Sequence, residues 1–385
     1  MLNRALLSLV VCACSVVLGA QSPVRQAAAA GSLRDQLQAK FEELHRAATF
    51  PGGTAGFVLA DGTSFGLAVG MSDRTSKTPM KVSDRLLLGS VGKTYVSAVA
   101  LQMMSEGKFS LDDALDKFFA KEPWFPRLAN ASSITVHHLM THTSGIVRYE
   151  LNPKFTTDLS ANPDKVWSGE DRLGYLLDAT PPFPPGKGWE YSDTNYIVLG
   201  MIIEKAGGKA YYDQLRTRVL DKHQLRDTVP ADSRVVPGLV QGYAGANNPF
   251  GGSDEMIKDG KFAVNPQFEW TGGGLAVTAL DLAKWGEILY EGRAFPAAMM
   301  PKFLDGVPAR LGPESKYGLG VIIRPSPMGI TYGHSGYMPG YQTELVYFPE
   351  LETSIAVQVN SSAPRSTGKS LRAFALDFAA IIKGS

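Results

Sequence analysis

Segments typical of β-strands stand at the two ends of this chain, and helical patterns fill the stretch between them. Near the N-terminus, residues 54–60 and 63–69 are mostly apolar and flank Asp61-Gly62, a dipeptide typical of a hairpin turn. The strand pattern returns only near the C-terminus. These later strands are expected at residues 317–324, 331–333, 344–348 and 353–359. Strands so far apart predict one sheet that both ends of the chain build together, with a helical region inserted in it.

Helical spacing of apolar residues marks the remaining segments. Residues 32–48 have this spacing, and residues 93–107 form a long, mostly apolar run that ends at a glycine. A helix also closes the chain, because apolar residues recur on one face of its last segment. They are Leu371, Phe374, Ala375, Phe378 and Ile381. We therefore expect an α/β (α+β) fold, in which residues 32–88 and 271–383 form a sheet domain and residues 89–270 a mainly helical insert.

The composition is that of a folded protein with little net charge. Hydrophobic residues make up 44% of the chain and charged residues 19%, which is typical of a globular protein and not of a disordered one. The formal net charge of +1 gives no sign of a nucleic-acid-binding surface or of a polybasic membrane anchor. We therefore expect no nucleic acid as a partner.

The first 20 residues have the pattern of an export signal. Arg4 supplies a positive start, and the apolar run over residues 5–19 is shorter than the roughly 20 residues that a membrane span needs. We expect cleavage after this segment, or as late as residue 30, and a periplasmic or secreted mature protein without a membrane span. Both cysteines, Cys12 and Cys14, lie in the signal, so the mature chain would hold no thiol. An uncleaved anchor and a lipid attachment at Cys14 are the alternatives.

Ser90 and Lys93 are separated by three positions at the expected start of the helix over residues 93–107. Side chains at i and i+3 of a helix lie on the same face. A lysine held there can take the proton of the serine if part of its population is neutral. The pair therefore offers a nucleophile and a base, although the spacing also fits an ordinary helix start with a solvated lysine.

Two later segments strengthen this interpretation. A buried phenol at Tyr191 beside a lysine ammonium would have its anionic form favoured, so it could act as a general base. His334 is expected at the end of a strand, and Gly336 after it leaves room for a substrate to lie against the backbone. The alternatives are a core tyrosine with a satisfied hydroxyl and a structural histidine at a strand end.

Together these segments resemble the serine β-lactamase and penicillin-binding protein superfamily, over roughly residues 35 to 380. The closest branch comprises the class C β-lactamases, the D-alanyl-D-alanine carboxypeptidases and related esterases. The segments that carry the resemblance are Ser90-Val91-Gly92-Lys93, Tyr191-Ser192-Asp193 and His334-Ser335-Gly336. The resemblance implies an antiparallel sheet with flanking helices and a helical domain, with the active site between them.

The resemblance also implies roles for single residues. Ser90 would be the acylated nucleophile, Lys93 and Tyr191 would share the proton transfers, and no metal or organic cofactor would be needed. His334 would orient Tyr191 and meet a carboxylate of the substrate, and it would titrate near neutral pH. The backbone amides of Ser90 and Tyr337 would form the oxyanion hole. A small-molecule or peptide substrate would be the partner, and it would bind along Asp193, Ser335, Gly336 and Tyr337.

One residue departs from the pattern of the family. The family has Tyr-x-Asn where this chain has Tyr191-Ser192-Asp193, and an ionised aspartate can only accept hydrogen bonds. Asp193 could pair with Lys93, raise its pKa and shift proton removal to Tyr191, or it could simply cap the helix that follows. We expect Asp193→Asn to raise acylation by penicillins.

Several readings of the function remain open. The first is an exported serine hydrolase that acts on D-amino-acid peptides, in the manner of a carboxypeptidase, or on esters. The alternatives are a class C-like β-lactamase, a penicillin-binding sensor with little turnover and a binding protein with a dead site. His138 and His142 stand at the i, i+4 spacing of metal ligands, but the glutamate of the zinc pattern is absent, so a structural role is favoured.

Overall fold

The computed structural model describes residues 23–246 and 248–385, and the expected export signal lies outside this part of the chain. Nine strands form one antiparallel sheet in the order β3-β2-β1-β14-β13-β12-β11-β10-β9. The sheet therefore joins strands from the two ends of the chain, as the sequence predicted. The strands are β1 Gly52–Val58, β2 Ser64–Asp73, β3 Thr78–Pro79, β9 Val307–Pro308, β10 Lys316–Tyr317, β11 Ile322–Ser326, β12 Gly329–Met338, β13 Tyr341–Phe348 and β14 Thr353–Val359.

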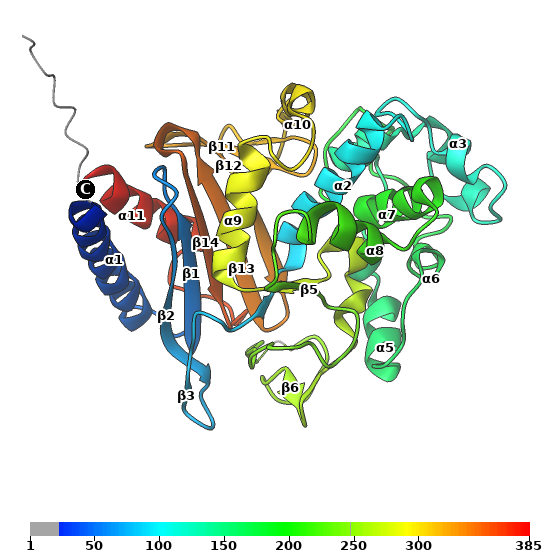
Figure 1. Ribbon diagram of the computed structural model, residues 1–385. Coiled ribbons are helices and arrows are strands. Elements are labelled where there is room, and N and C mark those ends of the chain that lie inside the picture. Colours follow the sequence, from blue (N-terminus) through cyan, green and yellow to red (C-terminus); the bar gives the residue numbers. More distant parts are fainter. Residues whose placement is uncertain (1–22, 247) are drawn as a thin grey trace, which may run out of the picture.

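Helices cover both faces of this sheet (Figure 1). The first and last helices, α1 (Pro23–Arg46) and α11 (Leu371–Lys383), lie side by side against one face. Their apolar side chains pack on the sheet, where the rings of Phe57 and Phe378 meet edge to face at 5.3 Å. The opposite face is covered by α9 (Ala279–Tyr290), which packs on β1, β13 and β14.

The remaining helices and short strands lie beside the sheet (Figure 1). The helices are α2 Lys93–Ser105, α3 Asp116–Phe119, α4 Val136–Met140, α5 Pro153–Ala161, α6 Gly169–Leu173, α7 Asp193–Gly207, α8 Tyr211–Leu215 and α10 Met300–Phe303. A small sheet joins β4 (Leu86–Leu87), β8 (Leu275–Val277) and β5 (Thr228–Pro230), and a two-stranded sheet joins β6 (Ile257–Lys258) to β7 (Lys261–Phe262). The division into two domains at residues 88 and 270 stays a prediction.

Two features of the strands differ from the sequence prediction. The strand expected over residues 317–324 is divided into two short strands, because the chain turns at Gly320 between β10 and β11. Gly320 has a φ of 90°, which glycine adopts readily and other residues rarely do. β12 is much longer than the expected 331–333, since it continues through a tight hairpin to β13 with Met338 opposite Tyr341. His334 therefore lies inside a strand and not at its end.

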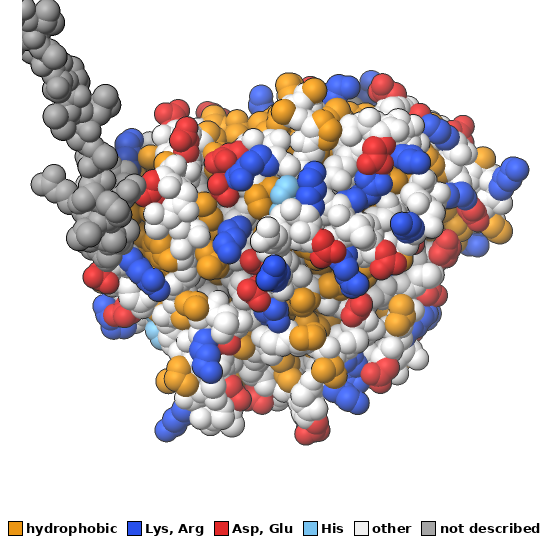
Figure 2. Space-filling model, in the orientation of Figure 1, with side chains coloured by type: hydrophobic (Ala, Val, Ile, Leu, Met, Phe, Trp, Pro, Cys, Tyr) orange, Lys and Arg blue, Asp and Glu red, His pale blue; other side chains and the backbone are white. Residues whose placement is uncertain are grey.

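The surface carries mixed charges. On the face drawn in Figure 2, acidic and basic side chains are interspersed, as the net charge of +1 leads one to expect. Within the described part of the chain, no helix combines the length and the apolar character needed to cross a membrane.

Candidate active site

Ser90 and Lys93 meet at the start of α2. Ser90 lies in a short 3₁₀ helix, Gly89–Gly92, which runs directly into α2 at Lys93. The side chains share one face of this turn, and Lys93 Nζ lies 3.0 Å from Ser90 Oγ. Ser90 is half-buried, whereas the Lys93 side chain is fully buried. The structure therefore places a serine hydroxyl at the surface of a cavity and a lysine directly behind it.

The ammonium of Lys93 has an acceptor for each of its three protons. Nζ donates to Ser90 Oγ, to the Gly272 carbonyl at 2.6 Å and to Asp193 Oδ1. Burial alone lowers the pKa of Lys93, but Asp193, Tyr191 and Glu269 together outweigh burial, so the pKa is raised above its usual range. Lys93 is thus held in its charged form, in which it cannot accept the proton of Ser90.

Asp193 is the first residue of α7, with Ser192 at the N-cap, and its side chain caps no helix. The capping alternative is therefore wrong. The carboxylate instead joins two cations, since Oδ1 accepts from Lys93 and Oδ2 lies 3.2 Å from a guanidinium nitrogen of Arg148. Burial raises the pKa of Asp193, but the Lys93 and Arg148 cations outweigh burial and bring the pKa well below its usual range. Asp193 is ionised at neutral pH.

Tyr191 lies beside this pair. The ring is 5.1 Å from Lys93 Nζ, and it packs at 4.2 Å from the ring of His142. The phenol oxygen is buried and has no hydrogen-bond partner in the described part of the chain. Burial raises the pKa of Tyr191, and the Lys93 ammonium offsets part of that rise. A buried hydroxyl without a partner, next to a cation and a serine, is available for proton transfer.

His142 holds Tyr191 in place from behind. Its Nδ1 accepts from the Ser192 amide at 3.2 Å and faces Asn195 Nδ2 at 3.1 Å. Burial lowers the pKa of His142 well below its usual range, so the ring is neutral. This contact agrees with the structural role expected for the histidine.

Two glycines bring β12 against the turn that holds Ser90. A Cβ on Gly336 would lie 2.1 Å from the Leu88 carbonyl, and a Cβ on Gly89 would lie 2.5 Å from the Tyr337 carbonyl. Only glycine permits so close an approach. Ser90 also stands in the first turn of its helix, where amide groups have no intrahelical acceptor. The backbones of Ser90 and Tyr337 are therefore neighbours, as an oxyanion hole between their amides requires.

His334 differs from the sequence prediction. It is buried, Nδ1 lies 2.7 Å from the Ser335 carbonyl, and Nε2 lies 2.9 Å from the Tyr317 hydroxyl. Since the carbonyl can only accept, Nδ1 carries the proton and Nε2 accepts from Tyr317. Burial and the Lys93 ammonium lower the pKa of His334 to about 3. The expected titration near neutral pH is therefore wrong, because burial and the Lys93 ammonium disfavour the imidazolium more than the Ser335 carbonyl and Asp193 favour it.

Tyr317 is a residue of the site that the sequence pattern did not reveal. Its ring packs against those of Tyr191 and His334, with centroids 6.1 Å and 5.7 Å away, and the Tyr191 and His334 rings lie 6.1 Å from each other. Ser335 points elsewhere, because it lines a separate cavity with Arg324, Glu344 and Arg372. A substrate contact at Ser335 stays a prediction.

A cavity of about 260 Å³ opens at Ser90. Arg148, Glu150, Asp193, Glu269 and Tyr337 form its polar side. Three of these residues, Arg148, Glu150 and Glu269, were missed by the sequence analysis. Arg148 and Glu150 come from one segment and Glu269 from another far along the chain, and no local spacing links either segment to Ser90.

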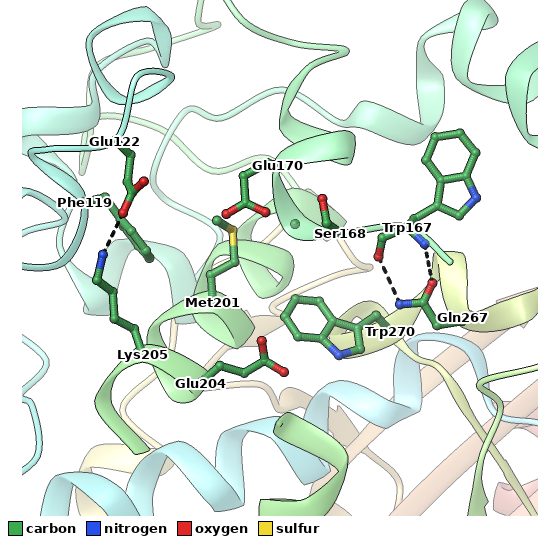
Figure 3. A pocket seen from close by; sticks show the side chains of 11 residues that line it. Phe119, Glu122, Trp167, Ser168, Glu170, Met201, Glu204, Lys205, Gln267 and Trp270 are labelled. Atoms are coloured by element: carbon green, nitrogen blue, oxygen red, sulfur yellow. Dashed lines mark hydrogen bonds and ion pairs between the residues drawn. The ribbon is translucent and has the colours of Figure 1, made fainter. Parts of the chain in front are cut away.

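A second and larger cavity of about 480 Å³ lies near Trp270, next to Glu269 in the chain (Figure 3). Lys205 pairs with Glu122 across it at 2.8 Å. The hydroxyl in its wall belongs to Ser168, which accepts from the Asp171 amide as a helix cap. No serine in its lining is paired with a base, so the smaller cavity at Ser90 is the candidate active site.

His138 and His142 have the i, i+4 spacing of metal ligands. Among residues 23–246 and 248–385, no group of three or more His, Cys, Asp or Glu side chains is arranged to hold a metal ion. His138 instead bonds the Thr135 amide through Nδ1 at 3.2 Å and completes a capping box at the start of α4.

An antiparallel sheet with a helical region beside it and a serine backed by a buried lysine define a serine hydrolase. A family model described as Beta-lactamase matches residues 37–380. The chain therefore belongs to the β-lactamase family, which confirms the resemblance inferred from the sequence.

The proteins to which this chain is similar include a penicillin-binding protein, an esterase and an amidase. The chain is 26% identical over 328 residues to penicillin-binding protein 4* of Bacillus subtilis (strain 168), which covers 82% of this chain and 69% of that protein. It is 30% identical over 205 residues to esterase EstB of Burkholderia gladioli, over 51% of this chain and 52% of the esterase. The solved D-amino acid amidase of Ochrobactrum anthropi SV3, complexed with L-phenylalanine amide, has a TM-score of 0.78 at 22% identity, over 92% of this chain and 99% of that one.

Proposed function

We propose that the protein is an exported hydrolase that forms an acyl-enzyme on Ser90 and acts on D-amino-acid peptides, amides or esters. The observation that carries this proposal is the distance of 3.0 Å between Lys93 Nζ and Ser90 Oγ at the floor of an open cavity. The names of the esterase and the amidase support a range of acyl substrates.

The proton of Ser90 would go to Tyr191. Because Lys93 keeps its charge, it acts by stabilising the phenolate form of Tyr191. Ser90 Oγ then adds to the carbonyl carbon of the substrate and loses its proton to the phenolate. Tyr191 returns that proton to the departing amine or alcohol. One water later hydrolyses the ester bond to Ser90 and releases the acid.

The oxyanion would be held by the amides of Ser90 and Tyr337. The close packing at Gly336 keeps these two backbones together. In a buried site such donors stabilise the negative charge that develops on the carbonyl oxygen, and loss of one donor typically slows the reaction by about 10²–10³-fold.

Intact-protein mass spectrometry tests the proposal. The protein, Ser90→Ala and Ser233→Ala would each be incubated with p-nitrophenyl butyrate, benzylpenicillin and D-phenylalanine amide. Ser233 is exposed, which makes its alanine variant a matched control. We expect an acyl adduct and turnover in the protein and in Ser233→Ala, and neither in Ser90→Ala.

The outcomes separate the alternatives. Full turnover by Ser90→Ala would refute the proposal. A stable penicilloyl adduct without turnover of any substrate would favour the sensor, and rapid loss of that adduct would favour a β-lactamase. Export is tested separately by N-terminal sequencing of the mature protein from periplasm and medium, where cleavage between residues 20 and 30 is expected.

A further inference from the structure

Three carboxyl groups share the cavity with Ser90, namely Glu150, Asp193 and Glu269. Two of them have cationic partners. Asp193 pairs with Lys93 and with Arg148, and Glu150 Oε1 lies 2.5 Å from Nε of Arg148. Two cations thus stand against three carboxyl groups, which leaves one negative charge without a partner when all three are ionised.

Glu269 is the carboxyl group without a partner. No residue in the described part of the chain donates a hydrogen bond to its side chain or forms an ion pair with it. It lies close to Asp193, since a Cβ on Gly272 would be 3.4 Å from Glu269 Oε2 and 3.9 Å from Asp193 Oδ1. The Gly272 carbonyl accepts from Lys93, which itself contacts Ser90. Glu269 therefore stands near the nucleophile with both oxygens free.

Glu150 has a free acceptor as well. Its Oε2 is buried and has no hydrogen-bond partner among the described residues. Buried acceptors in native proteins nearly always find a donor, so one without a partner needs an explanation. Glu269 and the Oε2 atom of Glu150 face the same cavity, and a positively charged donor placed between them would satisfy both.

Other charged groups near Glu269 are already satisfied. The buried guanidinium of Arg172 donates to the backbone carbonyls of Phe268, Gln267, Trp167 and Ser168. Arg148 is held by Glu150 and Asp193. Arg148 would attract a substrate carboxylate only by giving up these partners. The cavity is thus built to receive a cation and not the terminal carboxylate of a carboxypeptidase substrate.

The rest of the cavity wall is apolar except for Thr156. It is formed by Leu151, Phe155, Leu159, Pro249, Phe250, Phe268 and Pro339. A ligand that fills the cavity therefore needs an apolar group as well as a positive charge close to the carbonyl that Ser90 attacks. An amino acid with a free α-ammonium and an apolar side chain has both, and its ammonium is only one carbon away from the carbonyl.

We propose that Glu269, with Glu150, binds the α-ammonium of the substrate, so that the protein hydrolyses amides, esters or peptides of unblocked apolar amino acids. This inference rests on the proposed acyl-enzyme at Ser90. Glu269 acts on substrate choice, because it holds the acyl group in place while Ser90, Lys93 and Tyr191 carry out the bond changes.

Matched substrates test the inference. The free, N-acetyl and desamino forms of phenylalanine p-nitroanilide share a leaving group and an apolar side chain and differ at the α-ammonium. The first two would be assayed as D and L forms, with p-nitrophenyl butyrate as a neutral ester. We expect the protein to prefer the free amino acid, and we expect Glu269→Gln to lower kcat/KM on it at least tenfold. The N-acetyl, desamino and butyrate values should stay within twofold.

The controls separate this inference from the proposed function. Glu170 is an exposed carboxylate in the other cavity, so Glu170→Gln should leave kcat/KM unchanged on every substrate. Equal losses on all substrates in Glu269→Gln would overturn the inference, because Glu269 would then act through Lys93 or through folding. Preference for the N-acetyl form would also overturn the inference. If ester hydrolysis still required Ser90 in that case, the proposed acyl-enzyme would stand. Absence of any adduct or turnover would overturn both. Calorimetric binding of phenylalanine amide to Ser90→Ala, lost in Ser90→Ala/Glu269→Gln, would support the inference without catalysis.

Discussion

Replacement of Asp193 by asparagine tests how the charge of Lys93 is controlled. The amide has the same shape as the carboxylate but carries no charge, so the contact with Lys93 is kept while the ion pair is removed. Burial then dominates at Lys93 and lowers its pKa, because burial is the largest single influence on this group. The Asp193 charge also raises the pKa of Tyr191, so its removal favours the phenolate. Where Lys93 stays charged, the Tyr191 phenolate becomes more available, and where Lys93 loses its proton, Lys93 itself can take the proton of Ser90.

The size of the effect follows from the contact between the two groups. Two unit charges at about 4 Å interact by about 4 kcal/mol at an effective dielectric constant of about 20. At about 1.36 kcal/mol per pKa unit, this corresponds to about three units for Lys93. Two neighbours oppose the change, because Asp193 raises the pKa of Glu150 and of Glu269, and both carboxyls ionise more readily without it. We therefore expect acylation to rise by about ten- to hundredfold rather than a thousandfold.

Stopped-flow acylation with p-nitrophenyl butyrate and benzylpenicillin over pH 6 to 10 measures this change. The rate of Asp193→Asn should reach its plateau at a lower pH than that of the parent protein. Asp178→Asn, which removes a carboxylate from an exposed ion pair with Arg127, is the matched control and should behave as the parent. A variant with the parent's rate and the parent's pH profile would refute the reasoning. A slower variant with normal stability would show that the Asp193 charge itself assists the reaction.

Three further predictions follow from single residues. Gly336→Ala places a Cβ 2.1 Å from the Leu88 carbonyl, so we expect ester hydrolysis to fall by about 100-fold and urea unfolding to show a loss of about 1–3 kcal/mol. A Cβ on Gly384 would make only ordinary contacts, so Gly384→Ala should change neither ester hydrolysis nor stability. Equal behaviour of the two glycine variants would contradict the packing argument. The folded pKa of His334, about 3, lies below the unfolded value of about 6.5, so the unfolded chain binds the proton first and stability falls as the pH drops through this range. Between pH 6.5 and 5, the free energy of unfolding measured in urea should fall by about 2 kcal/mol less in His334→Gln than in the parent protein. Equal losses in the two proteins would show that His334 is not buried in its neutral form. Burial, then the Asp193 charge, raises the pKa of Glu269 to about 7, while Lys93, Arg148 and Arg172 oppose the rise. Because an α-amino group loses its proton near pH 8, kcat/KM for phenylalanine p-nitroanilide should rise through pH 7 and fall above about pH 8, and the N-acetyl form should lack both limbs. Identical pH profiles for the two substrates would exclude the pairing of Glu269 with the α-ammonium.

Much of the fold was predictable because its signals are local. Alternating apolar residues and the Asp61-Gly62 turn marked β1 and β2, and the helical spacing after Ser370 marked α11. The strand at 317–324 was wrong because one glycine bend divides an otherwise continuous pattern. A short turn of this kind depends on the φ of one residue, which hydrophobic periodicity does not report.

The site was predictable only where residues stand close together in the sequence. Ser90 and Lys93 share a helical turn, so their spacing in the sequence predicts that the two side chains are in contact. Glu150 and Glu269 reach the same cavity from separate loops, and only the three-dimensional fold brings them to Ser90. The state of His334 was wrong for a related reason, because burial and a distant cation set its pKa and neither is visible in the local sequence.

The pairing of β1 with β14 constrains how this chain can fold. Gly53 lies opposite Val359, so the sheet joins a segment near the start of the chain to one near its end. The entropic cost of closing a loop grows slowly with its length, but contacts of such long range slow the search for the native state. During synthesis the middle of the sheet stays open until the last strand has left the ribosome. Chains that end before β14 therefore expose the unpaired edge of β1 and are prone to aggregation, and those that end before β12 also lack the Tyr337 backbone beside Ser90.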